Sequence, residues 1–246
     1  MEIKLKPINL VFNEGRHTYL LEGKSVPGAS SISGILPKPW MAPWASKLAV
    51  ETVAQFWKAG KKYDKEEIAQ YLSLAKGAHT IRKNVALTAG TDAHAWFEAF
   101  IKTGTEPPIP EDTEVANSIE AFRKWRDSHE IEWLLSEVIV GSITHQVAGK
   151  LDSVALIDGK LTLVDFKTSK AIYKEEYYIQ TALYKMMLEE MGCPVIEQRL
   201  ILRVPKDESG FEAHIVESDY EADKEAAISA IQVYNYLKKF PKEWIK

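Results

Sequence analysis

Residues 149–170, GKLDSVALIDGKLTLVDFKTSK, constrain the fold more than any other stretch of this chain. Two runs of strand-forming residues flank Asp158 and Gly159, a dipeptide that favours a two-residue turn between antiparallel strands. When the pairing is extended outward from this turn, Asp152 falls directly opposite Asp165. The stretch therefore predicts a β-hairpin whose two strands bring two carboxylates face to face.

Opposed carboxylates need a compensating charge. Side chains at directly opposed positions have Cβ atoms about 4.5 to 5.5 Å apart, and like charges there destabilise a sheet. A divalent cation such as Mg²⁺, which binds oxygen ligands, resolves the conflict. Lys167 shares a strand face with Asp165, whereas Phe166 points to the other face, because side chains alternate along a strand. Two carboxylates, a cation and a lysine fit phosphodiester hydrolysis, in which the metal polarises the phosphate and activates a water. The alternative is an Asp165–Lys167 surface ion pair beside an unrelated turn aspartate.

The patterns along the rest of the chain predict a mixed α/β protein with a helical N-terminal half. Apolar residues at helical spacing and alternating apolar residues mark the elements. A small hairpin is predicted over 17–29, turning at Glu22 and Gly23. Helices are predicted over 39–60, 64–76, 78–87, 91–104, 113–130, 173–192 and 221–240, and strands over 132–141, 146–157, 160–167, 195–204 and 211–218. We expect one domain over 1–246, with a hairpin and helical region over 1–110 and an α-β-β-β-α-β-β-α core over 111–246.

Composition narrows the class of protein. The chain is 46% hydrophobic and 27% charged, which is typical of a soluble globular protein. No stretch approaches the roughly 20 apolar residues that span a bilayer, so we expect a cytoplasmic protein without a membrane partner. Cys193 is the only cysteine, which excludes an internal disulfide and a multi-cysteine iron-sulfur or zinc site. The chain also lacks a phosphate-binding G-x-x-x-x-G-K-(S/T) loop, so no helicase motor is expected.

Charge and tryptophans in the first half leave two interpretations open. Residues 1–110 hold 14 Lys and Arg against 10 Asp and Glu, although the whole chain has a net charge of -4. The basic residues gather over 58–65 and 76–84, either as solvated helix ends or as a surface that contacts a phosphate backbone. Trp40, Trp44 and Trp57 either stack on unpaired bases beside these segments or belong to the core.

Four short motifs in order resemble the RecB-type exonuclease branch of the PD-(D/E)XK nuclease superfamily. They are GTDAH at 90–94, GKLDSVAL from 149, VDFKTSK from 164 and QTALY at 180–184. Residues 17–47, from HTYLLEGKSVP through LPKPWMAPWASK, also resemble the N-terminal region of phage-type members of this branch. The resemblance implies a restriction-endonuclease-like core, in which helices flank a central mixed β-sheet.

The resemblance also implies roles for individual residues. Asp152 and Asp165 bind the metal, the backbone carbonyl of Phe166 completes its coordination, Lys167 is the catalytic lysine and His94 is an additional ligand. Three further positions keep an alternative. Glu137 supports the metal or faces solvent, and Gln180 and Tyr184 lie near the DNA or form a helix packing face. Further candidate DNA contacts are Lys170, Arg82 and Lys83.

The implied function is a Mg²⁺- or Mn²⁺-dependent DNA nuclease. We expect an exonuclease in DNA recombination, repair or phage DNA metabolism, acting in a bacterial host or a phage-infected cell. Its partners are then DNA and a single-strand annealing protein or another recombination protein. Three alternatives remain: a structure-specific endonuclease that cuts flaps or branches, a nucleic-acid-binding module without turnover, and an unrelated hairpin protein with chance matches.

Overall fold

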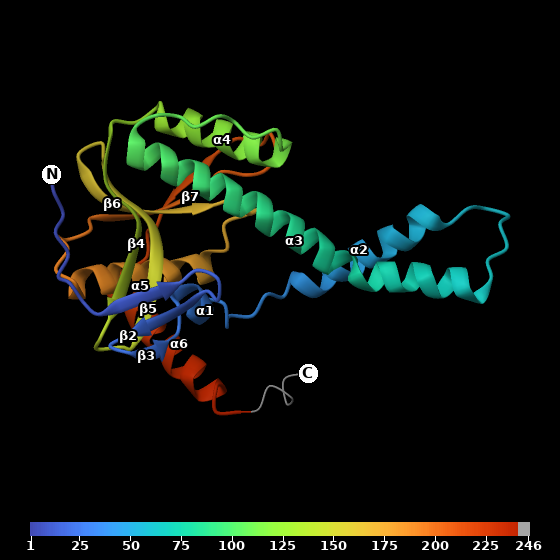
Figure 1. The fold of residues 1–246 in the computed structure, drawn as a ribbon, viewed down its shortest axis with the longest axis horizontal. Helices are drawn as coiled ribbons and strands as arrows, with labels where there is room; N and C mark the ends of the chain where they lie inside the picture. The colour runs from blue at the N-terminus through green and yellow to red at the C-terminus, as the bar shows by residue number, and fades with distance from the viewer. Residues whose placement is uncertain (241–246) are drawn as a thin grey trace. The chain divides into compact units, whose positions relative to one another are not determined.

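The computed structural model describes residues 1–240, and this part of the chain divides into two compact units (Figure 1). Unit 1 comprises Met1–Leu36 and the residues from Ala93 onward, and unit 2 is Pro37–Asp92. The division describes compactness alone, so the single functional domain stays a prediction. No helix of the described residues is long and apolar enough to cross a membrane.

Unit 1 is built on a five-stranded mixed sheet in the order β4-β5-β6-β7-β8. Neighbouring strands pair antiparallel except β6 and β7, which pair parallel. The chain passes from β6 to β7 through helix α5 (Lys174–Glu190). Its strands are β4 (Ile131–Ser142), β5 (Val147–Ile157), β6 (Lys160–Lys167), β7 (Gln198–Arg203) and β8 (Glu212–Ile215). Its later helices are α4 (Thr113–Arg126), α5 (Lys174–Glu190) and α6 (Tyr220–Leu237). The predicted α/β class and the order α-β-β-β-α-β-β-α are confirmed.

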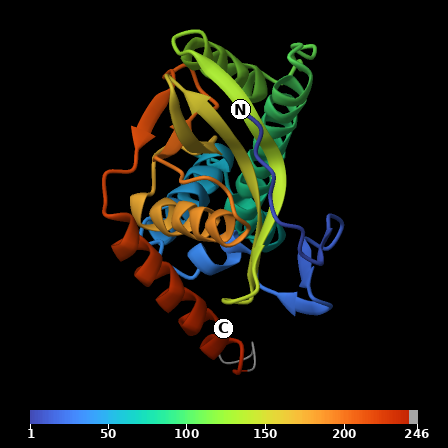
Figure 2. The ribbon, with the colours of Figure 1, turned by 90° about the vertical axis from the view of Figure 1, so that its left-hand side faces the viewer.

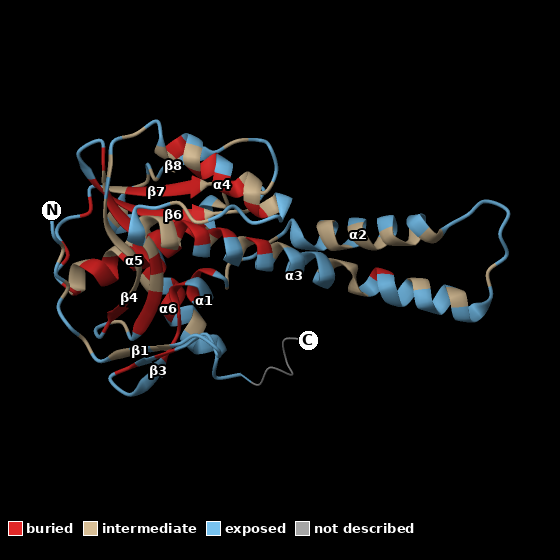
Figure 3. Cartoon of the chain, turned by 45° about the horizontal axis from the view of Figure 1, so that its top comes forward, coloured by how far each residue is buried: buried red, intermediate tan, exposed pale blue. Residues whose placement is uncertain are grey.

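The hairpin turn forms as its residues predict. Asp158 and Gly159 both have positive φ, 48° and 79°, which a two-residue turn of this hand requires. The ladder then runs from Ile157–Lys160 to Ser153–Val164, the register that the sequence predicts. β6 is buried along almost its whole length, because it lies at the centre of the sheet with helices on both faces (Figure 3).

Two helical layers cover the sheet. Helices α1 (Ala29–Ser33), α5 and α6 pack on one face around buried aliphatic side chains such as Leu151, Leu163 and Leu183, and Figure 2 shows α5 and α6 side by side. The last turns of helix α3 (Lys65–Thr103) and helix α4 cover the other face of the sheet, and an aromatic cluster fills the space between them and the sheet. Its rings contact one another at centroid distances of 4.7 to 6.4 Å and belong to Trp96, Phe97, Phe122, Trp125, Trp133 and Phe166. The sheet is thus the middle layer of unit 1.

A second, smaller sheet precedes the core. It comprises β1 (Leu10–Asn13), β2 (Thr18–Leu21) and β3 (Lys24–Val26), all antiparallel. The predicted hairpin at Glu22 and Gly23 is present, but β1 was not predicted. The sheet attaches to β5 because the Ala148 N–H donates to the Pro27 carbonyl at 3.0 Å, and Leu21 and Val26 bury against Ala148.

The three helices predicted between 64 and 104 are a single helix, α3 (Lys65–Thr103), so that prediction is wrong in its boundaries. Thr91, the predicted start of the last one, lies inside α3 and its hydroxyl donates to the Leu87 carbonyl at 3.1 Å. Interior glycines such as Gly77 did not end the helix either, since each costs only about 1 kcal/mol relative to alanine. The predicted end at Gly104 is confirmed by its positive φ of 67°. Unit 2 holds α2 (Met41–Phe56) and the part of α3 up to Asp92.

Candidate active site

The candidate active site lies where β5 and β6 stop pairing. The last paired residues are Ser153 and Val164, and the next residue outward on each strand is an aspartate. At this point Asp152 does not continue the ladder; its Oδ2 accepts a hydrogen bond from the Phe166 N–H at 2.7 Å. The separation of the two strands opens the sheet to groups from both helical layers.

Asp152 is the residue that connects the two sides of this opening. Its Oδ1 lies 3.5 Å from Nδ1 of His94, which α3 contributes. Burial raises the pKa of Asp152, but the His94 and Lys167 charges and the Phe166 N–H outweigh burial and hold it below its usual value. The pKa of His94 is raised, since the Asp152 carboxylate outweighs the effect of burial. Asp152 is therefore ionised and held in a fixed position, two properties that a metal ligand needs.

Asp165 is buried more deeply, with 2% of its side chain exposed. Burial, reinforced by the Asp152 charge, raises the pKa of Asp165 to about 6 despite the opposing effect of Lys167. Its Oδ2 lies 2.5 Å from Lys167 Nζ as an ion pair, and no other group in the described part of the chain donates a hydrogen bond to it. A carboxylate that is buried this deeply needs a compensating positive charge, which Lys167 supplies.

Lys167 is held from three directions. Besides Asp165, its Nζ donates to Gln180 Oε1 at 3.2 Å and lies 4.8 Å from the centre of the Tyr177 ring. Burial lowers the pKa of Lys167, but the charges of Asp165 and Asp152 outweigh it and raise the pKa above its usual value. The ammonium group therefore stays protonated, which suits it to orient anionic groups and to stabilise developing negative charge.

Glu137 joins the site from β4. The register of β4 on β5 places Glu137 opposite Asp152. Its φ is 52°, a value that is uncommon for a residue other than glycine. Only 12% of its side chain is exposed, so of its two alternatives the solvent-facing one is wrong. One ligand atom each from His94, Glu137 and Asp152 lie within 4.8 Å of one another, a spacing that a metal ion can bridge. Burial, with the Asp152 charge, raises the pKa of Glu137 although Lys150 opposes this.

Gln180 and Tyr184 lie behind the site on one face of α5. Gln180 Nε2 donates to the Tyr184 hydroxyl at 3.2 Å, and that hydroxyl donates to the Lys150 carbonyl at 3.0 Å. Both side chains are buried, so they serve as a helix packing face while Gln180 also holds Lys167. Contact with DNA stays a prediction for both.

Lys150 and Tyr177 adjoin the site but were not predicted. Lys150 lies two residues before Asp152 and its Nζ is 2.5 Å from Glu137 Oε2, so alternation along β5 was the signal that could have found it. Tyr177 lies three residues before Gln180 on α5, a helical spacing that also carries the signal. Burial raises the pKa of Tyr177 to about 12, so its hydroxyl is neutral.

The remaining predicted DNA contacts are exposed side chains. Lys170 is exposed in the loop that follows β6, and Arg82 and Lys83 are exposed residues of unit 2. Their role as DNA contacts stays a prediction, as does the Phe166 carbonyl as a metal ligand. Glu98 forms an ion pair with Lys102 one turn along α3.

The donor set suits a hard or borderline divalent cation. The three groups close enough to share an ion are the Asp152 and Glu137 carboxylates and the His94 imidazole, which are ligands that Mg²⁺ or Mn²⁺ accepts. Asp165 does not belong to this set and instead forms an ion pair with Lys167, so its role as a metal ligand stays a prediction. The convergence of three ligand atoms from His94, Glu137 and Asp152 fits such an ion. The geometry therefore supports a site for a divalent cation next to a protonated lysine.

Comparisons with known proteins give little further information. No family model matches the chain, and no curated protein matches it. Among solved structures, it is similar to an alkaline exonuclease, LHK-Exo, from Laribacter hongkongensis, with 14% identity over 61% of this chain and 83% of that chain and a TM-score of 0.30. It is also similar to SSO0001, with 11% identity over 79% of this chain and 86% of that chain and a TM-score of 0.31. These TM-scores are too low to define a shared fold, so the functional argument rests on the site.

Proposed function

We propose that this protein is a Mg²⁺- or Mn²⁺-dependent deoxyribonuclease that hydrolyses phosphodiester bonds. One observation carries the proposal: where β5 and β6 separate, Asp152 lies close to two further metal-binding side chains, and Asp165 is buried in an ion pair with Lys167. A binding module without turnover has no physical need for such an arrangement, because buried carboxylates destabilise a fold unless they are compensated.

Each residue has a separate task in this proposal. Asp152, Asp165, Glu137 and His94 hold the cation, which would polarise the scissile phosphate and lower the pKa of a bound water. Lys167, kept protonated by Asp165, orients the nucleophile and stabilises the charge that develops on the phosphate oxygens. Gln180 positions Lys167 through its side-chain oxygen.

Within this class we propose an exonuclease of DNA recombination, repair or phage DNA metabolism. The recombination partner and the RecB-type branch are proposed from the sequence motifs, and the cytoplasmic location from the lack of a long apolar stretch. End-labelled linear, circular and flapped DNA compared in one assay with Mg²⁺ separate the two modes of cleavage. Circular DNA that stays intact while linear DNA is degraded supports the exonuclease, and a discrete internal product supports the endonuclease instead.

The catalytic assignment is tested by Lys167→Ala. Loss of a buried ammonium that stabilises transition-state charge should lower kcat at least about 100-fold. Lys160→Ala is the matched control, because Lys160 lies on the same strand but is exposed at the hairpin turn. Degradation of linear DNA by Lys167→Ala at the rate of the unaltered protein would falsify the assignment.

The metal assignment is tested by Asp152→Asn with Mn²⁺ in a calorimeter. We expect at least about a tenfold loss of affinity, since a neutral amide is a poor ligand for a hard cation. Asp158→Asn serves as the control, because the turn aspartate uses Oδ1 only to accept the Glu130 N–H and an amide oxygen can replace it. Equal Mn²⁺ affinities in the two variants would remove Asp152 from the metal site.

A further inference from the structure

Unit 2 exposes an apolar surface that its own residues do not cover. Helix α2 has no buried residue, and the only buried residues within 37–92 are two alanines, Ala75 and Ala89 (Figure 3). Several large side chains stand in solvent, among them Trp57 at 69% exposure, Val50 at 66% and Leu72 at 57%. For Trp57, the interpretation as a core residue is wrong.

These side chains form a groove between the two helices of unit 2. The groove has a volume of about 570 Å³. Helix α2 contributes Ala49, Val50 and Val53, Trp57 directly follows the end of α2, and α3 contributes Leu72 and Lys76. Its walls are apolar, with Trp57 at the end of α2 and Lys76 as the charged lining residue. A planar apolar group with a negative charge beside it matches this surface.

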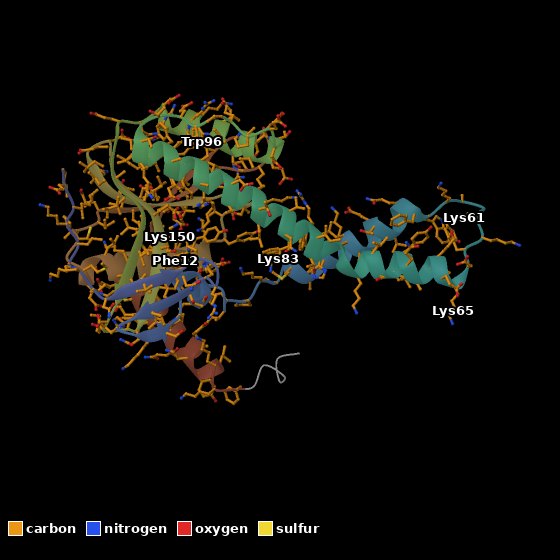
Figure 4. All side chains as sticks on the ribbon, viewed as in Figure 1. Phe12, Lys61, Lys65, Lys83, Trp96 and Lys150 are labelled. Carbon is orange, nitrogen blue, oxygen red and sulfur yellow. The ribbon has the colours of Figure 1, made fainter. Side chains whose placement is uncertain are left out.

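The charge of unit 2 selects between possible occupants. Residues 37–92 hold nine Lys and Arg against five Asp and Glu, a net charge of +4, whereas the rest of the chain holds 22 against 30. Four of the lysines, Lys58, Lys61, Lys62 and Lys65, follow Trp57 within eight residues, and Figure 4 shows Lys61 and Lys65 at the loop between the helices. Two copies of unit 2 would repel each other, whereas a polyanion would be attracted.

Trp57 is held as a flat platform. Its ring stacks on Tyr63 at 5.5 Å and 20°, and the Tyr63 hydroxyl donates to the Phe56 carbonyl at 2.9 Å, which fixes the loop to the end of α2. Lys61 Nζ lies 4.7 Å from the centre of the Tyr63 ring. One indole face therefore rests on a tyrosine, and the exposed fraction of Trp57 leaves surface on which a further ring can stack.

We propose that the unit 2 groove binds single-stranded DNA, with an unpaired base stacked on Trp57 and phosphates contacted by Lys58, Lys62, Lys65 and Lys76. Aromatic platforms beside lysines are the usual means of binding single strands without sequence preference. The inference rests on the proposed function for its choice of DNA as the polyanion. It adds a second site for the substrate, on residues other than those that hold the metal.

The stacking contact is tested by the anisotropy of fluorescein-labelled dT30, titrated with the full chain in EDTA so that no hydrolysis occurs. Trp57→Ala should weaken binding about 5- to 150-fold, the equivalent of one lost base stack, while Trp57→Phe retains most of the affinity. Val195→Ala is the control, because Val195 is an exposed apolar residue of unit 1, at 75% exposure.

The phosphate contacts are tested by the salt dependence of the same binding. Replacing Lys58, Lys62 and Lys65 by Gln should reduce the slope of log K against log salt by about 2, since each phosphate contact to a single strand contributes about 0.7. Lys61 is left unchanged because it pairs with Glu67 at 2.6 Å. A control chain in which Lys4, Lys24 and Lys160, all exposed in unit 1, are replaced by Gln has the same net charge.

The outcomes separate this inference from the proposed function. The groove is overturned as a DNA site if the Trp57 variant binds dT30 as tightly as its control and the lysine variant has the same salt slope as its control. Absence of any dT30 binding by the unaltered chain overturns it as well. If the unaltered chain sediments as a dimer, and Trp57→Ala dissociates this dimer without changing the DNA affinity, the occupant of the groove is a second copy of the chain instead. Binding that depends on Trp57 without hydrolysis in Mg²⁺ or Mn²⁺ overturns the nuclease and leaves the groove in place.

Discussion

Replacing Tyr184 by phenylalanine removes one hydroxyl behind the candidate active site and leaves the ring in place. That hydroxyl accepts from Gln180 Nε2 at 3.2 Å and donates to the Lys150 carbonyl at 3.0 Å, and the side chain is only 5% exposed. Burial, with the nearby Asp165 and Asp152 charges, raises the pKa of Tyr184 well above its usual value, so the hydroxyl remains a donor. The substitution therefore deletes two buried hydrogen bonds without changing charge.

The magnitude follows from the group that is left unpaired. Gln180 is 9% exposed, so water cannot readily replace the hydroxyl as a partner for its amide. A buried polar group that loses its partner costs about 1 to 3 kcal/mol, and we expect the free energy of unfolding to fall by this amount. Because Gln180 also accepts from Lys167 Nζ, kcat should fall while KM for DNA changes little.

Urea denaturation followed by circular dichroism measures the first effect, and initial rates on linear DNA measure the second. Tyr236→Phe is the matched control, because Tyr236 lies on α6 with 58% of its surface exposed and should lose less than about 0.5 kcal/mol. A Tyr184→Phe chain as stable as the control would show that the two hydrogen bonds do not organise this region. A lower stability with an unchanged kcat would instead show that Gln180 does not position Lys167 for catalysis.

Three further substitutions test the surrounding structure by denaturation. Gly149→Ala places a Cβ 2.7 Å from Tyr184 Cε1 and should cost about 1 to 3 kcal/mol through overpacking; an unchanged midpoint would contradict the close approach. Arg199→Met leaves the half-buried Asp223 carboxylate without the guanidinium 2.5 Å away, for a loss of about 3 kcal/mol, and a gain in stability would refute this. Glu190→Gln tests pH dependence: burial raises the pKa of Glu190, but hydrogen bonds from one hydroxyl and two backbone N–H groups outweigh it and lower the pKa. The stabilisation from the Glu190 carboxylate is complete above the ordinary glutamate pKa of about 4.3 and is lost as the pH falls through the lower pKa of the folded state. The Tm of the Gln variant should therefore fall less between pH 5 and pH 3 than the Tm of the unaltered protein. Parallel curves of Tm against pH for the two proteins would exclude the effect.

Local patterns predicted most of the fold of unit 1. The turn at Asp158 and Gly159 needs two residues with positive φ, a requirement that these residue types meet, and the register of β5 on β6 followed from it. Predictions of element boundaries failed where the residues at a boundary are also compatible with a continuous element. Residues such as Thr91 resemble helix starts, but their hydroxyls also bond within a continuous helix, so three predicted helices are one. β1 was missed because its pairing with β2 involves only four residues.

The sequence by itself determined the hairpin, the order of elements in the core and the position of Asp152 and Asp165 next to one another along the two strands, because strand alternation and turn geometry depend only on neighbouring residues. Tertiary structure decided the rest. It brought His94 from α3 and Glu137 from β4 to Asp152, and it buried Asp165 against Lys167, because these contacts depend on where β5 and β6 separate. It also decided that Trp57 is exposed, since burial is set by which surfaces meet and not by the apolar pattern of one helix.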